Sequence, residues 1–194
     1  NEGNGLNINF SYFTNGISYS LNLHRYDNIE FRTDREAKGL ELILNYLPPL
    51  TKQHIFSLPA FYPHSTQGNG EIGLQNELTF TLSPNFFLEG QSGTTFALGF
   101  SLIKSLDTTN TDAFKYKSPF LAVGKELFYR DINADIRTKI SKDLEIEFAV
   151  INIIYNKDVM ENSGSPLYGK VRSTTIGSEI IYNFDNRRSF RLEL

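Results

Sequence analysis

The sequence predicts an all-β protein: an antiparallel up-and-down transmembrane β-barrel of about ten strands, formed by a single domain over residues 1–194. Three observations lead to this prediction. Apolar and polar residues alternate along most of the chain, no segment repeats with a helical period, and short turns alternate with long polar loops. Because successive side chains of a strand point to opposite faces, alternation predicts strands with one apolar and one polar face.

The alternation is clearest around a turn predicted at residues 141–143. Before it, every second residue belongs to one predicted face, which carries Ile132, Ala134, Ile136, Thr138 and Ile140. After it, Leu144, Ile146 and Phe148 belong to one predicted face in the same way. Further alternating rows lie at residues 6–12, 17–23, 40–46, 72–82, 96–102, 176–184 and 190–194. The predicted strands of about 8–13 residues are close to the ~9–11 that a tilted membrane strand needs.

The predicted connections differ in length at the two ends of the strands. Short turns are expected at residues 14–16, 47–52, 141–143 and 185–188, and a longer one begins at residues 83–85. Long polar loops are expected at residues 26–38, 63–70, 105–118 and 157–169. Outer-membrane barrels have this asymmetry, with short periplasmic turns and longer external loops.

The polar face favours a membrane barrel over a water-soluble one, since alternation alone fits both. It mixes small residues with charges of both signs, which suits a packed or water-filled interior. We expect lipid to contact Ile132, Ile136, Leu144, Ile146, Phe148, Phe96, Leu98 and Phe100, and an aromatic girdle to include Tyr12, Tyr46, Tyr62, Tyr182 and Phe184. The alternative is a soluble antiparallel β-barrel that binds a small apolar ligand.

The candidate site is a set of charges that alternation places on the polar face of the last strands. We expect a lumen charge network of Asp135, Arg137, Lys139, Glu145, Glu147, Glu179, Arg191 and Glu193, with Asp131 beside it. Such charges either fill the lumen with ion pairs or form a constriction that selects solutes.

No other pattern in the sequence predicts an enzyme, a cofactor or a metal. Gly68, Gly70 and Gly73 have the G-x-G-x-x-G spacing, but a strand is expected after them where a nucleotide site needs a helix. His24, His54 and His64 lack metal-ligand spacing and are expected on the surface or the barrel rim. Ser57 near His54 is the only nearby nucleophile–base pair, without a G-x-S-x-G motif.

Composition and charge narrow the partners further. A net charge of −3 argues against nucleic-acid binding, and the absence of cysteine excludes disulfides and thiolate metal sites. The acidic and basic residues of the loop at 26–38 are expected to be solvated rather than to bind a partner or a divalent cation.

Four landmarks occur in order along the chain, at residues 48–54, 67–75, 116–126 and 154–159. With them the chain resembles an uncharacterised outer-membrane β-barrel family of the Bacteroidota, whose members are considerably longer. The resemblance implies the bacterial outer membrane, with the lipid bilayer, lipopolysaccharide and other outer-membrane proteins as partners. It implies a pore for small solutes or a structural, accessory component of a larger assembly.

The resemblance also implies that the chain is an internal portion of a larger barrel. A strand with an unpaired edge would leave N–H and C=O groups that lipid cannot satisfy. We therefore expect the strands at residues 6–13 and 190–194 not to pair with each other, and to need strands outside this chain.

Overall fold

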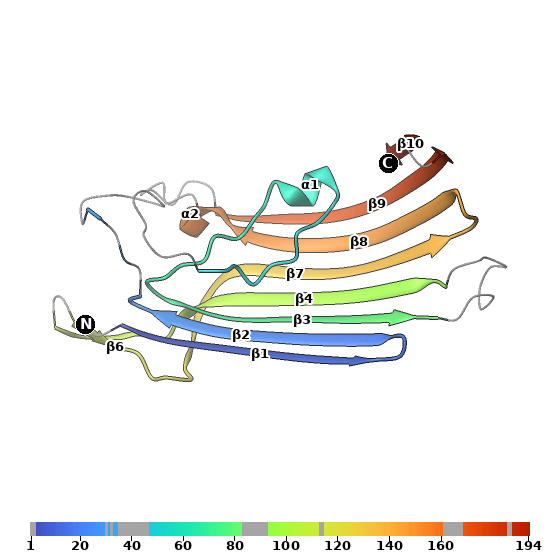
Figure 1. The fold of residues 1–194 in the computed structure, drawn as a ribbon. Coiled ribbons are helices and arrows are strands. Elements are labelled where there is room, and N and C mark those ends of the chain that lie inside the picture. Colours follow the sequence, from blue (N-terminus) through green and yellow to red (C-terminus); the bar gives the residue numbers. More distant parts are fainter. Residues whose placement is uncertain are drawn as a thin grey trace.

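The protein is built around one antiparallel sheet of eight strands (Figure 1). The computed structural model describes residues 3–29, 31, 33–34, 47–82, 93–112, 115–160, 169–185 and 188–194. The strands of this sheet are β1 (Asn4–Thr14), β2 (Ile17–Asp27), β3 (Glu71–Thr81), β4 (Thr95–Leu106), β7 (Val123–Lys139), β8 (Leu144–Asn156), β9 (Lys170–Asp185) and β10 (Arg188–Glu193). The predicted all-β antiparallel fold is thus confirmed.

The sheet is a meander in which each strand pairs with its neighbours in the order β1-β2-β3-β4-β7-β8-β9-β10. Within the described residues the sheet is open, because β1 and β10 form its two edges and do not pair with each other, as predicted. Closure into a barrel is not seen. The turn at Asn15 and Gly16, where Gly16 has a φ of 77°, joins β1 to β2, and the turn at 141–143 joins β7 to β8, both as predicted.

The two faces of the sheet differ as the alternation predicts. The outer face exposes large apolar side chains, among them Leu98 (47%), Ile132 (45%) and Phe148 (45%). The residues predicted to contact lipid all have the register of this face, and Asp135, Arg137, Glu145 and Glu147 have the register of the opposite, inner face. Tyr12, Tyr182 and Phe184 are also exposed, whereas the predicted row at 40–46, including Tyr46, lies outside the described residues.

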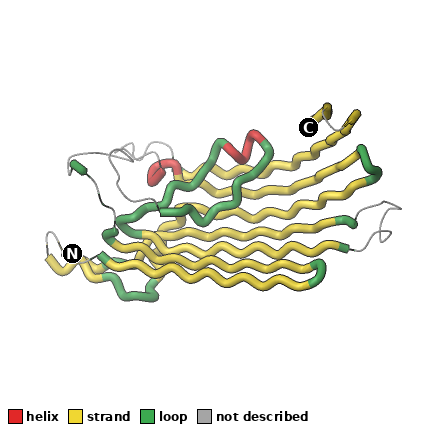
Figure 2. Tube along the Cα trace, viewed as in Figure 1, coloured by secondary structure: helices red, strands yellow, loops and turns green. Residues whose placement is uncertain are grey.

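Residues 47–70, here called the crossing segment, contradict the predicted short turn at 47–52 and the separate loop at 63–70. This segment contains no strand. It runs across the inner face in front of β7, β8 and β9, and carries the one-turn helix α1 (Ser57–Ala60) (Figure 2). Tyr62 was wrongly predicted at a strand end; its ring packs against Tyr155 of β8, 5.6 Å between centroids. The crossing segment begins with Pro48 and Pro49, which cannot donate the backbone hydrogen bonds of a hairpin, and the residues after them pack against the sheet.

Two glycines of the sheet let the crossing segment approach closely. A Cβ atom on Gly177 of β9 would lie 2.6 Å from ring carbons of Phe56. A Cβ atom on Gly73 of β3 would lie 2.9 Å from Leu50 Cδ1. Both distances are shorter than real Cβ contacts, so each glycine provides a socket for an apolar side chain of the segment.

The apolar core lies between the crossing segment and the inner face. Leu50 and Phe56 pack there with Ile103, Tyr129 and residues of β8, all buried. The core members from β8 are Ala149, Ile151, Ile153 and Tyr155. Beneath the segment the inner face therefore combines this apolar core with buried carboxylates such as Asp131 and Glu71, whereas closer to the turns it is mainly charged.

A small hairpin occupies part of the loop predicted at 105–118. Its strands are β5 (Thr109–Asp112) and β6 (Lys115–Lys117). The Tyr116 hydroxyl donates to Asp27 Oδ1 at 2.6 Å, and burial with this hydrogen bond raises the pKa of Tyr116 to about 12. Asp27 also pairs with Arg25 at 3.1 Å. Asp27 is thus buried at the end of β2, not solvated in a loop as predicted; Glu30, Arg32, Arg35 and Glu36 of that loop lie outside the described residues.

The described helices are α1 and α2 (Lys157–Met160), each a single turn, in agreement with the prediction of a nearly helix-free chain. Among the residues described, none belongs to a helix with the length and apolar character needed to cross a membrane.

The Gly177 socket predicts a specific coupling. Gly177→Ala forces the new methyl group into the Phe56 ring, so we expect it to lower the free energy of unfolding by about 1–3 kcal/mol. Phe56→Ala removes the clash, so adding Gly177→Ala to that variant is expected to cost little. Chemical denaturation of the four proteins of this double-mutant cycle measures the coupling; additive effects would show that Phe56 does not occupy the socket.

Candidate functional site

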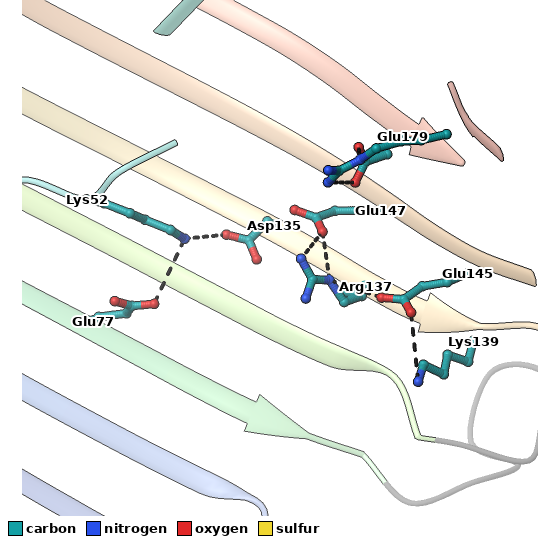
Figure 3. A network of polar contacts seen from close by, with 9 residues as sticks. Lys52, Glu77, Asp135, Arg137, Lys139, Glu145, Glu147 and Glu179 are labelled. Atoms are coloured by element: carbon teal, nitrogen blue, oxygen red, sulfur yellow. Dashed lines mark hydrogen bonds and ion pairs between the residues drawn. The ribbon is translucent and has the colours of Figure 1, made fainter. Parts of the chain in front are cut away.

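The candidate site is the charged part of the inner face, between the crossing segment and the turns (Figure 3). All eight residues predicted for the lumen network lie on this face and take part in ion pairs or hydrogen bonds. At its centre, Arg137 of β7 donates from Nε to Glu147 Oε2 at 2.7 Å and lies 3.4 Å from Glu145. Lys139 Nζ lies 3.8 Å from Glu145. The register explains these contacts, because Arg137 is paired with Glu147 and Lys139 with Glu145.

The network continues onto the last strands. Arg191 of β10 pairs with Glu179 of β9, with Nη2 donating to Oε2 at 2.7 Å. Glu179 is 3% exposed, so Arg191 compensates a carboxylate that water hardly reaches. Glu193 Oε1 accepts from the backbone N–H of Ser57 at 3.1 Å and from its hydroxyl at 3.3 Å. The network thereby anchors helix α1 to the sheet edge.

Lys52 of the crossing segment completes the charged face, and the sequence analysis missed it. Its ammonium lies 2.6 Å from Asp135 Oδ2 and 3.9 Å from Glu77 Oε1, and it donates to Asn133 Oδ1 at 3.3 Å (Figure 3). Lys52 was read as part of a turn, so nothing in the alternation indicated that it faces the sheet. Glu77, whose strand β3 contains no basic residue, was the available signal.

A cavity of 290 Å³ lies between the crossing segment and the sheet. Its wall combines charges with apolar surface. The charged lining comes from Lys52, Glu77, Asp135, Arg137 and Glu147. Because the wall carries both signs and its charges are already paired, the cavity suits water or a small polar solute.

The histidines are buried, which corrects their predicted place on the surface or rim. His54 Nε2 lies 2.6 Å from Asp131 Oδ2, and Asp131 is fully buried. His24 and His64 both face Glu71 of β3, at 2.6 Å and 3.0 Å from its two carboxylate oxygens. The buried carboxylates of Asp131 and Glu71 thus each face a histidine of another segment, and a buried charge needs such a partner.

Three arrangements considered from the sequence are not formed by these groups in the part of the chain that the structure describes: a metal cluster, a Ser57–His54 pair and a nucleotide-binding turn. No cluster of His, Asp and Glu there could hold a metal ion. The Ser57 hydroxyl bonds Glu193, and His54 faces Asp131, so these two residues do not form a nucleophile–base pair. After Gly68 and Gly70 the chain enters β3, not the helix that a nucleotide site needs.

One signal in the sequence indicated the part of the inner face that the crossing segment covers. From Ala149 to Tyr155 the apolar residues lose their alternation, with only Asn152 polar. Such a run predicts a strand buried on both faces. It marks where the crossing segment lies.

The buried pair at His54 predicts an asymmetric response to mutation. His54→Ala removes the imidazole that faces the buried Asp131 carboxylate, and we expect a loss of about 3–5 kcal/mol in the free energy of unfolding. Asp131→Asn in the His54→Ala background removes the uncompensated charge and should recover part of that loss.

Lys139→Gln serves as the control. It removes the ion pair between Lys139 and Glu145, in which the Lys139 side chain is half exposed, so the free energy of unfolding should fall by at most about 1 kcal/mol. Equal losses for His54→Ala and Lys139→Gln in denaturation experiments would contradict the buried pair.

The comparisons with known proteins identify a family without an assigned activity. Neither the curated proteins nor the solved structures contain a match to this chain. The model of a family of unknown function, DUF6029, matches residues 1–194. Because that match covers the whole sequence given, the chain belongs to the DUF6029 family.

Proposed function

We propose that this sheet is part of the wall of an outer-membrane β-barrel whose interior is occupied by the crossing segment, and that it serves as a structural or accessory component of an outer-membrane assembly. The observation that carries the proposal is the contrast between the two faces. The outer face exposes rows of large apolar side chains across β1 to β10, whereas the inner face carries ion pairs.

The outer face supports lipid as its neighbour. Water-soluble monomers rarely expose contiguous apolar surface that extends over several neighbouring strands. On β8 the outward residues are apolar from Leu144 to Val150 and again at Ile154, with Asn152 between them. In a bilayer the edges of β1 and β10 would have to be paired, so the proposal requires further strands from this protein or from a partner.

The crossing segment supports a filled interior over an open pore. Lys52 and His54 contact carboxylates of β7, Ser57 contacts Glu193 of β10, and Phe56 occupies the Gly177 socket of β9. A segment held at several points across β7, β9 and β10 would block solutes wider than the cavity beneath it.

The alternative of a soluble barrel with an apolar ligand receives less support. Its ligand would occupy an enclosed apolar space, yet the described cavity is lined by five charged residues. The largest apolar surface lies instead on the exposed face.

Single tryptophans test which face contacts lipid. Tyr19 and Ser20 are adjacent on β2 at the same depth but on opposite faces, and the chain contains no tryptophan. In the full-length protein, freed of any other tryptophan and reconstituted, we expect lipids brominated on the acyl chains to quench Tyr19→Trp strongly and Ser20→Trp weakly. Equal quenching, or stronger quenching of Ser20→Trp, would overturn the proposed membrane wall.

An arginine series on β8 tests depth. Val150→Arg lies near the middle of the outward row and should cost about 2–4 kcal/mol in refolding into lipid vesicles. Leu144→Arg lies at the turn end, where the same change should cost only about 0–1 kcal/mol. Equal penalties at the two positions would contradict a bilayer centred on this row.

A further inference from the structure

The outer face changes character at the end of the strands that carries the long loops. There, basic residues follow the apolar rows. Lys170 lies at the very start of β9, and three others lie next to the apolar side chains: Lys104 on β4, Arg130 on β7 and Arg172 on β9. We call these three residues the basic rim. Farther along the outward rows of β4, β7 and β9, towards the turns, no acidic or basic side chain occurs among the described residues until the strands end.

The register brings the basic rim together. Arg130 and Arg172 are both paired with Ile154, from opposite sides. Strands lie about 4.8 Å apart, so the two arginine backbones are separated by roughly 10 Å. Lys104 belongs to the strand on the other side of β7, one step nearer the loops, where it is paired with Leu127. Three long cationic side chains therefore share one small area.

No described acidic residue forms an ion pair with the basic rim. Glu126 of β7 lies at the same end, but its Oε1 accepts from Asn156 Nδ2 at 3.1 Å. The recorded side-chain hydrogen bond of Arg130 is to Asn152 Oδ1 at 2.8 Å, and its Nε is buried without a partner. Lys104 and Arg172 have no recorded partner. Arg25 occupies the same end of β2 but is buried and paired with Asp27 at 3.1 Å. At this end of the sheet, Arg25 is thus paired with a carboxylate, whereas the three residues of the basic rim are not.

We propose that the basic rim binds the phosphate groups of a phosphorylated glycolipid of the outer leaflet, of the lipopolysaccharide class. Arginine suits phosphate because its planar guanidinium forms two parallel hydrogen bonds to the oxygens. The apolar rows of β7, β8 and β9 next to the rim would contact the acyl chains of the same molecule. The long loops assign this end to the external side. The inference rests on the proposed membrane wall.

Binding of purified lipid A tests the basic rim. The full-length protein in phosphatidylcholine nanodiscs is titrated with diphosphoryl lipid A, with dephosphorylated lipid A and with phosphatidylglycerol. The wild type should prefer diphosphoryl lipid A over both others. Arg130→Gln/Arg172→Gln should bind it about 30-fold more weakly, since each basic residue near a membrane surface contributes about a fivefold factor, and should lose the preference.

The matched control is Lys115→Gln/Lys117→Gln, which removes two exposed cations from the β5–β6 hairpin. Its lipid A affinity should equal that of the wild type, and circular dichroism should show the same strand content in all three proteins. Equal weakening in the control, or no preference of the wild type for phosphate, would overturn the basic rim. Tight binding of phosphatidylglycerol would overturn the choice of a glycolipid.

The Tyr19→Trp reporter separates this inference from the proposed function. If brominated lipid quenches Tyr19→Trp but the wild type does not prefer diphosphoryl lipid A, only the proposed role of the basic rim is wrong. If lipid does not quench it, the membrane wall and the basic rim are both wrong.

Discussion

The buried ionic contacts between the crossing segment and the sheet are the constraint on which the remaining structure depends. Asp131 and Glu71 are fully buried carboxylates, and their partners His54 and His64 both come from this segment. A buried carboxylate without a partner costs several kcal/mol, so the inner face and the segment need each other. The Gly73 and Gly177 sockets fix where the segment lies, because apolar side chains enter only where a Cβ atom is missing.

This constraint gives the two faces different roles. The inner face pairs its charged groups with its own chain, as at Asp131, Glu147 and Glu179. Among the described residues, nothing comparable covers the outer face over β3, β4 and β7 to β9, and this face exposes side chains such as Leu98 and Phe148. A sheet that satisfies its charges inwards and exposes its apolar rows outwards has the polarity of a membrane wall. That polarity is the physical basis of the proposed function.

The sequence was sufficient for the strands and their sidedness, because a period of two residues leaves each residue only one possible face once the register is known. It therefore predicted the eight network charges. It did not predict the crossing segment, whose position depends on contacts between residues far apart, such as Lys52 with Asp135. The β5–β6 hairpin and the burial of Asp27 were missed for the same reason: they depend on Tyr116, almost ninety positions away. Local patterning indicates that the middle of β8 is covered on its inner face, but it does not indicate which segment covers it.

The most direct test of the account is whether the crossing segment lies on the inner face in the native membrane. The chain has no cysteine, so Lys52→Cys/Asp135→Cys can be crosslinked with a short bifunctional thiol reagent in intact cells. Ala97→Cys/Asp135→Cys, which are register partners on β4 and β7, provides the positive control. The account predicts efficient crosslinking of both pairs before detergent is added. Crosslinking of the control pair alone would place the segment elsewhere and contradict a filled interior.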